Sequence, residues 1–296
     1  MKNFDRYVGI DWSGAKAPVF TKSIAVAYCE AGEAPPCLVR GPQNGKWSRT
    51  AVADWILSLL KTPQRVLIGI DANFGYAKDV GVSQFGKSYN YKTLWADVEA
   101  KSKHDANFLA QGFWEAWPQH FWTEGKQPAH ITLPKRTTET VCGEAGYGWP
   151  ESPFKLLGPK QVGKGGLAAM RMAHYLKREA GDKICIWPFE KHIADTSQIV
   201  ISEIYPRQFL RRSMHGNAKV NSLKALNEVL QKQDSNPIKN KTYRFNDHDA
   251  DAIVSASGLR MLCGDQKTLP KSISDPPLLD KKAISCEGWI FGVGDQ

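Results

Sequence analysis

Two short β-rich segments of this chain end in the same tripeptide, Gly-Ile-Asp. The first segment reads YVGIDWSG and contains Asp11, and the second reads VLIGIDANFG and contains Asp71. Successive side chains of a strand point to opposite faces, so each aspartate shares a face with the glycine two positions before it and has open space behind it. If the two strands are parallel neighbours, the carboxylates lie about 5 Å apart. Close carboxylates repel each other and a divalent cation is the usual remedy, so the repeated tripeptide predicts a magnesium site.

A third acidic segment, NDHDADAIVSA at 246–256, is expected to open a helix, because Asn and Asp cap helix N-termini and acids suit the positive end of the helix dipole. Some of these acids therefore only cap the helix. Asp247 and His248 each share a helix face with Asp251, whereas Asp249 points nearly opposite and is predicted to be solvated. Asp251 lies too far inside the helix to cap it. We predict Asp251 and Asp247 as metal ligands and His248 as a catalytic group, and leave open which of the three earlier residues acts with Asp251.

Glu203 is unusual because it lies within the apolar run IVISEIYP, and charged side chains are almost never buried without a partner. Its side chain shares a strand face with Ile199 and Ile201. Two interpretations follow. Glu203 is either an edge-strand residue paired with a nearby arginine such as Arg207, or a further catalytic carboxylate on the face of the two strand-end aspartates.

The elements that position these acids follow from the hydrophobic pattern. Residues 7–11, 23–29 and 37–40 are predicted to form three strands of an antiparallel meander, because their connections are short. A helix over 49–61 with one apolar stripe then leads to a strand over 65–71. A strand–helix–strand crossover of this kind returns the chain to a parallel neighbour and is right-handed in nearly all sheets.

The second half of the chain is predicted to add further elements and to complete an α/β protein. They are expected as helices over 165–178, 222–232 and 247–263 and as strand candidates over 183–189 and 198–205. Pro188 predicts that the first of these two strands lies at an edge of the sheet or ends there. Near the C-terminus, EGWIFGV is expected to dock as an extended segment.

Residues 76–165 change character and are predicted to form a large insertion over one edge of the sheet, within a single domain that spans residues 1–296. Only residues 95–112 show a clear periodic pattern there. The tryptophans and basic residues of this segment are Trp114, Trp117, Trp122, Trp149, Lys126, Lys135, Arg136, Lys155 and Lys160. Such a mixture could bind single-stranded nucleic acid. We favour the plainer interpretation that the tryptophans pack the insertion onto the core, because large aromatic side chains are mostly core material.

The stretch GPKQVGKG, residues 158–165, nearly matches the phosphate loop Gly-x4-Gly-Lys-Ser/Thr, but Gly165 replaces the hydroxyl residue that would bind magnesium. The preceding SPFKLL is also a poor buried strand. We therefore favour a glycine-rich, basic helix start that contacts a nucleic-acid phosphate through backbone N–H groups, Lys160 and Lys164. A flexible turn before a helix is the plain alternative.

Composition narrows the class of protein. The chain has 296 residues, of which 42% are hydrophobic, and a net charge of +9, so a substantial core is expected and polyanions are favoured as partners. No two of its six cysteines form a Cys-x-x-Cys pair, which argues against a structural zinc site. The N-terminus lacks the apolar region of a signal peptide, and no apolar stretch reaches the length of a membrane span. We therefore expect a cytoplasmic protein with free thiols and no membrane partner, whose oligomeric state stays open.

The ordered set of these segments resembles the ribonuclease H-like superfamily. The closing HDADAIVSA is similar to the last helix of its Holliday-junction resolvase branch, in which a histidine or aspartate precedes the final aspartate by three positions, as His248 precedes Asp251. The whole set is similar to a bacterial family of unknown function predicted to be ribonuclease H-like nucleases, whose elements look like GIDWSG, GIDAN, LGPKQVGKGG, EIYP and EGWIFGV. The acids of the last helix are closer together here than this resemblance leads us to expect, which leaves Asp247 or Asp249 for the second role.

This resemblance implies a mixed five-stranded sheet, three antiparallel strands and then parallel ones, flanked by helices. It also implies phosphodiester hydrolysis of nucleic acid, DNA or RNA, by a two-metal site with Mg²⁺ or Mn²⁺. Asp11 would bridge both metals, and Asp71 and Asp251 would each hold one. The remaining ligand or proton-transfer role would fall to Glu203, Asp247 or His248.

Two other classes of function stay open. An ATP-dependent phosphotransferase of the actin and sugar-kinase type shares the Gly-Ile-Asp strand, but WSGAK supplies only part of its glycine-rich phosphate turn. The 296 residues also leave little room for the duplicated fold of that class. A non-catalytic module would keep the acids and bind nucleic acid or protein.

Overall fold

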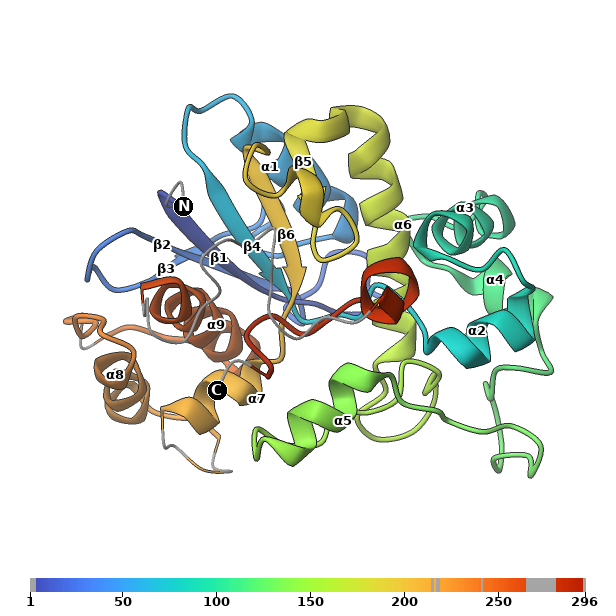
Figure 1. Cartoon of the computed structure of the whole chain (residues 1–296). Helices are drawn as coiled ribbons and strands as arrows, with labels where there is room; N and C mark the ends of the chain where they lie inside the picture. Colours follow the sequence, from blue (N-terminus) through green and yellow to red (C-terminus); the bar gives the residue numbers. More distant parts are fainter. Residues whose placement is uncertain (1–3, 214–215, 217–218, 241, 265–280, 295–296) are drawn as a thin grey trace.

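Within residues 4–213, 216, 219–240, 242–264 and 281–294, which the computed structural model describes, six strands form one mixed sheet (Figure 1). The strands are β1 (Arg6–Asp11), β2 (Ala25–Glu30), β3 (Cys37–Val39), β4 (Val66–Ile70), β5 (Ile184–Ile186) and β6 (Ile199–Glu203). Their order across the sheet is β3-β2-β1-β4-β6-β5. The first three strands pair antiparallel, whereas β1–β4, β4–β6 and β6–β5 pair in parallel. The α/β class and the antiparallel-then-parallel pattern expected from the sequence are therefore confirmed.

The five strands that the resemblance implies are one too few, whereas the strand candidate predicted over 183–189 is present as β5. The described residues contain a sixth strand, β5, because the three residues Ile184–Ile186 pair in parallel with β6. β5 lies at the edge of the sheet and ends before Pro188, as that proline predicts. The strand is short because the chain turns immediately after it, and the Ile186 N–H donates to the carboxylate of Glu190.

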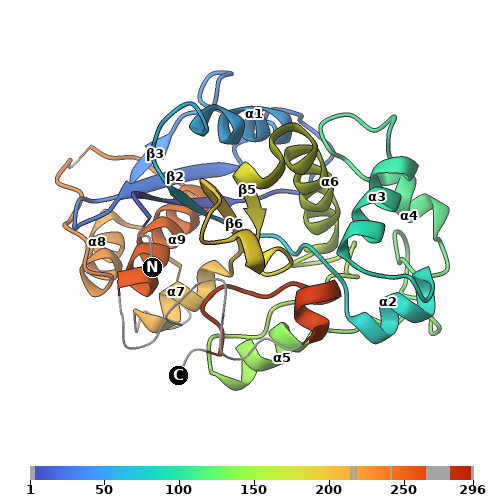
Figure 2. The same cartoon turned by 45° about the horizontal axis from the view of Figure 1, so that its top comes forward.

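Helices cover both faces of the sheet (Figure 2). One face packs against α1 (Arg49–Leu59) and α6 (Gly163–Ala180), and the other against α7 (Pro206–Arg212), α8 (Leu223–Lys232) and α9 (Asp247–Gly264). The alternation of strand side chains produces this division. Val8 and Ile10 belong to the core with α1 and α6, whereas Tyr7 belongs to the core with α9. Asp11, four residues after Tyr7, therefore lies on the α9 face of β1.

The glycines of the two Gly-Ile-Asp segments allow α9 to pack closely on the sheet. A Cβ atom at Gly9 would lie 2.3 Å from the carbonyl oxygen of Ala252 and 2.6 Å from the nitrogen of Ala256. A Cβ atom at Gly69 would lie 2.8 Å from a methyl carbon of Leu259. The sequence predicted open space behind each aspartate, but the α9 helix fills it. This close packing of α9 on the sheet also brings an acid of α9 to the strand ends.

Residues 76–165, the predicted insertion, contain the short helices α2 (Lys78–Phe85), α3 (Tyr91–Lys101), α4 (Gln111–Ala116) and α5 (Thr137–Glu144). Their aromatic side chains continue the core that contains α1 and α6, and Phe113 and Phe154 are fully buried in it. Trp95 and Trp114 are also buried, so the core-packing interpretation is confirmed for them. Trp117 is partly buried against the same core and Trp122 is only half-buried, whereas 61% of Trp149 is exposed, so the interpretation holds for part of the set.

The C-terminal segment joins the insertion to the sheet. It begins with a π-helical turn, Ala283–Glu287, and the Glu287 carboxylate accepts hydrogen bonds of 3.0 Å from the N–H groups of Lys78 and Thr137. These are the first residues of α2 and α5, so one buried carboxylate caps two helix N-termini. Phe291 then donates its N–H to the carbonyl oxygen of Glu203 at 2.9 Å. Among the described helices, none is both long and apolar enough to cross a lipid bilayer.

Candidate functional site

The two strand-end aspartates lie beside each other. β1 and β4 are parallel with Gly9 opposite Gly69 and Ile10 opposite Ile70, so Asp11 and Asp71 occupy the next position of the same register. The Asp71 N–H also donates to the carbonyl oxygen of Ile10 at 3.0 Å. The parallel pairing predicted from the repeated tripeptide is therefore present, and both residues stand at the carboxyl ends of neighbouring strands.

Helix α9 adds a histidine and a third acid to this edge of the sheet. His248, in the first turn, places Nδ1 2.5 Å from Oδ2 of the buried Asp11. Asp251, one turn later, is partly buried and precedes Ala252, whose carbonyl faces Gly9. The close packing of α9 on β1 therefore brings His248 and Asp251 to the strand ends, on one helix face, as their spacing predicts.

The electrostatics of these groups show that the carboxylates disfavour one another's charge. Burial raises the pKa of Asp71 well above its usual range, and the charges of Asp11, Asp251 and Glu203 raise it further. Burial and the charge of Asp11 raise the pKa of Asp251 to about 7. Burial also raises the pKa of Asp11, although the hydrogen bond from His248 opposes that rise. The same hydrogen bond raises the pKa of His248. The three aspartates therefore favour one another's protonated forms, and the charges of His248 and Arg207 oppose this only in part at Asp251.

The chemistry of this donor set fits a hard divalent cation. Across the described residues, neither Asp71 nor Asp251 forms an ion pair with a lysine or arginine, and carboxylate oxygens are the ligands that Mg²⁺ and Mn²⁺ prefer. The arrangement is not yet a ligand cage. Within the same residues, no group of three or more His, Cys, Asp and Glu side chains lies in a metal-holding arrangement. A bound cation would therefore require these carboxylates to turn toward one another.

The two acidic residues in the first turn of α9, Asp247 and Asp249, have different partners. Asp247 is exposed and forms an ion pair with Lys219, so its charge is already balanced at the rim of the site. Asp249 accepts a hydrogen bond from the Asn246 N–H at 3.2 Å, and the Asn246 side chain accepts one from the Asp249 N–H at 3.0 Å. Asp249 therefore caps the helix reciprocally with Asn246. Asp249 does not line the cleft, but it is partly buried rather than solvated, and its charge contributes to the raised pKa of Asp11.

Glu203 lies near Asp71, and its charge acts on that carboxyl, but the two side chains lie on different faces of the sheet. The parallel register of β4 and β6 pairs Ile70 with Glu203, so the Glu203 side chain lies on the sheet face opposite to that of Asp71. It accepts two hydrogen bonds from Arg136, at 2.6 and 2.8 Å. The partner is thus Arg136 from the insertion rather than Arg207, and β6 is an inner strand rather than an edge strand. The interpretation of Glu203 as a further carboxylate on the face of the strand-end aspartates is not supported by this geometry.

The Arg136 guanidinium is the centre of a buried network. It also contacts the Glu139 carboxylate and donates to the carbonyl oxygen of Glu287 at 2.7 Å. Burial alone would lower the pKa of Arg136, but the charges of Glu139 and Glu203 raise it above its ordinary value. The two-pronged contact favours the charged form of Glu203, against the burial that raises its pKa. The network therefore holds the insertion, β6 and the C-terminal segment together beside the site.

The first turn of α6 is packed against the residues that follow both strand-end aspartates. Trp12 donates its indole N–H to the carbonyl oxygen of Gly165 at 3.0 Å. A Cβ atom at Gly14 would lie 2.3 Å from the Gly165 nitrogen, and one at Gly166 would lie 1.9 Å from the side-chain oxygen of Asn73. The positive end of an 18-residue helix is thereby placed beside the acidic cluster. Over the described residues between α5 and α6 there is no strand, so GPKQVGKG lacks the strand that precedes a nucleotide phosphate loop.

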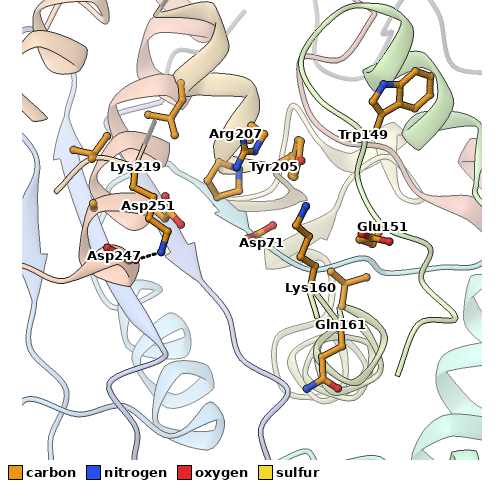
Figure 3. A pocket seen from close by; sticks show the side chains of 15 residues that line it. Asp71, Trp149, Glu151, Lys160, Gln161, Tyr205, Arg207, Lys219, Asp247 and Asp251 are labelled. Atoms are coloured by element: carbon orange, nitrogen blue, oxygen red, sulfur yellow. Dashed lines mark hydrogen bonds and ion pairs between the residues drawn. The ribbon is translucent and has the colours of Figure 1, made fainter. Parts of the chain in front are cut away.

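A cleft of about 360 Å³ opens at this site (Figure 3). Figure 3 shows Asp247 and Asp251 on one wall, Trp149 and Glu151 on the other, and Asp71 between them. Lys160, three residues before the start of α6, lines the cleft and lies beside Asp71 in Figure 3. Lys164 instead lies over the Trp114 ring, with Nζ 5.5 Å from the ring centroid, and lines a neighbouring cavity with Gly14.

Sequence reasoning missed several residues that line this cleft. Tyr205 and Arg207 lie two and four positions after Glu203, so the EIYP segment is a usable signal for this wall of the cleft, although the sequence predicts Arg207 only as a partner of Glu203. Trp149 was grouped with the other insertion tryptophans, because composition alone does not separate an exposed indole from buried ones. Comparisons with protein-family models, curated proteins and solved structures find no match to this chain.

Proposed function

We propose that this protein is a metal-dependent phosphodiester hydrolase that acts on nucleic acid. The observation that carries the proposal is that Asp71 and Asp251 line one cleft, and that neither forms an ion pair with a lysine or arginine among the described residues. The buried Asp11 lies behind them, at the register position of β1 beside Asp71. Mutually repelling, partly buried carboxylates are costly to a fold unless something else stabilises their charge. A divalent cation is the partner best suited to three hard oxygen donors.

In this proposal Asp11, Asp71 and Asp251 hold the cation. A divalent cation bound there would supply the positive charge that activates a water molecule and neutralises the phosphate. His248 keeps the Asp11 carboxylate oriented through its 2.5 Å contact and is placed to hold a proton near the reacting atoms. Lys160 and the first turn of α6 offer positive charge to a phosphate group that enters the cleft.

The test is isothermal titration of the metal-free protein with Mn²⁺, together with a nucleic-acid cleavage assay. Asp11→Asn is expected to weaken Mn²⁺ binding by more than about tenfold and to abolish cleavage while the fold stays intact, because a ligand oxygen is replaced by a neutral amide. Asp54→Asn, at an exposed position of α1, is the matched control for loss of one negative charge. Unchanged Mn²⁺ affinity in Asp11→Asn would refute the assignment. Binding of ATP without metal-ion binding would favour a phosphotransferase, and binding of neither would favour a non-catalytic module.

A further inference from the structure

One wall of the cleft presents an unusually exposed tryptophan. Over the part of the chain that the structure describes, three large apolar side chains are exposed, namely Val19, Trp149 and Val162. Two of the three, Trp149 and Val162, line the cleft that contains Asp71 and Asp251. Trp149 is the most exposed of the three, at 61%. The two exposed side chains offer an apolar contact surface to a ligand that enters this charged cleft.

The indole ring of Trp149 packs against neighbouring residues that fix its position. A Cβ atom at Gly143 would lie 2.1 Å from a carbon of the Trp149 six-membered ring, so the ring rests on the backbone of α5. Lys135 places Nζ 5.3 Å from the ring centroid. The preceding Gly148 has a φ of 108°, and a Cβ atom there would lie 2.9 Å from the Arg207 side chain. Two glycines therefore determine where this ring sits relative to the acidic cluster.

The surroundings of the ring suit a nucleic-acid strand. Lys160 and Arg207 line the same cleft near Asp71, and Lys219, ion-paired with Asp247, lines its far wall (Figure 3). The chain as a whole carries a net charge of +9. Proteins that bind single strands combine a basic groove, which follows the phosphates, with aromatic rings on which bases stack. The bases of a duplex are stacked on one another inside the double helix, so they are not free to stack on an indole in a cleft wall.

We propose that Trp149 is a stacking platform for an unpaired base of a single-stranded nucleic acid, whose backbone passes Lys160 to reach the carboxylates. This inference names the substrate class of the hydrolase proposed above and rests on that proposal. The ring contributes to strand binding through its face, so a phenyl ring at the same position retains part of the function.

The experiment measures the binding of a fluorescent oligothymidylate, and of the corresponding duplex, by anisotropy in the presence of Ca²⁺. Trp149→Ala is expected to weaken single-strand binding about 5-fold to 100-fold, because one base–aromatic stack is removed. Trp149→Phe is expected to fall between this variant and the wild type. Trp122→Ala is the matched control, because that indole bonds the carbonyl of Glu124 at 2.8 Å and lies outside the cleft.

A second variant moves the ring without removing it. Gly143→Ala keeps a good helix residue in α5 but drives a methyl group into the indole, so it is also expected to weaken single-strand binding. Single-strand affinity of Trp149→Ala equal to that of the wild type, or equal affinity of the wild type for duplex and single strand, would overturn the inference. Efficient displacement of the strand by ATP would also overturn it in favour of a nucleotide site.

The same protein samples separate this inference from the hydrolase proposal. Trp149→Ala is expected to bind Mn²⁺ as the wild type does, because the ring contacts none of the three carboxylates. Normal Mn²⁺ binding with unaltered strand affinity in Trp149→Ala would defeat the stacking inference alone. Loss of strand affinity in Trp149→Ala, in a protein that binds no Mn²⁺ at all, would support stacking and defeat the hydrolase proposal.

Discussion

The strongest prediction concerns the stability of the metal-free protein when Asp251 is replaced by asparagine. The pKa of Asp251 rises from its ordinary 3.8 to about 7 in the folded state, so the folded protein holds a proton that the unfolded chain has already released. The folded state binds more protons between these two values. The free energy of unfolding therefore falls as the pH rises from about 4 to about 7, because ionised Asp251 is less stable in the folded protein than in the unfolded chain.

The size of the effect follows from the shift. One pKa unit corresponds to about 1.4 kcal/mol, so the full shift sets an upper limit of about 4 kcal/mol at pH 8. Asp251 is only partly buried, and screening by solvent reduces this figure to an expected 1–3 kcal/mol, roughly. Asp251→Asn removes this penalty, which already includes the repulsion with Asp11. The variant is therefore expected to be more stable than the wild type at pH 8 by about 1–3 kcal/mol, and close to it at pH 4.

Urea denaturation in the presence of EDTA, at pH 4 and pH 8, measures this difference. Asp249→Asn is the matched control, because an asparagine at that position still accepts the hydrogen bond from the Asn246 N–H. Added Mn²⁺ at a hundred times its dissociation constant is expected to stabilise the wild type by about 2.7 kcal/mol and to leave Asp251→Asn nearly unchanged. If Asp251→Asn is no more stable than the wild type at pH 8 without metal, the acidic cluster is not under electrostatic strain and the reasoning fails.

Three further predictions test the geometry. Gly9→Ala is expected to lower the free energy of unfolding by about 1–3 kcal/mol, because the added methyl group meets the α9 backbone. Gly264→Ala is the neutral control, because a Cβ atom there has no other atom within 4 Å. Equal unfolding midpoints for the two variants would contradict the close packing. Asp249→Asn is expected to retain nuclease activity and Asp251→Asn to abolish it, and equal losses in the cleavage assay would mean that the helix phase is wrong. Arg136→Met is expected to lower the free energy of unfolding by about 3–5 kcal/mol in a denaturant titration, because the buried carboxylates of Glu139 and Glu203 lose their partner. A loss below about 1 kcal/mol would show that the network is not buried as described.

The sheet and the pair Asp11–Asp71 could be predicted because their signals are local. Each Gly-Ile-Asp follows a β-rich run, and the helix between them leaves a parallel neighbour as the natural arrangement. The helix phase of α9 could likewise be predicted from spacing, since His248 and Asp251 face the strand ends together. The short helices α2, α5 and α7 were missed, because seven or eight residues carry too little apolar periodicity, although Pro206 at the first position of α7 was a usable sign.

The partners of the remaining charged residues could not be predicted, because they come from distant parts of the chain. Glu203 and Arg136 are 67 positions apart, and only the register of β4 and β6 shows that Glu203 lies on the face opposite to Asp71. Trp149 presents the same difficulty. Its exposure depends on Gly143 and on the loop that crosses Arg207, and no local pattern distinguishes it from Trp114.

The central claim is that the carboxylates of Asp11, Asp71 and Asp251 share a divalent cation. Crystals soaked in Mn²⁺ and measured for anomalous scattering test it most directly. The account predicts an anomalous peak at the strand ends, within bonding distance of oxygens from at least two of these side chains, and its absence from Asp11→Asn crystals. A well-ordered cleft without such a peak, or with the three carboxylates each bound by a lysine or arginine, would contradict the account.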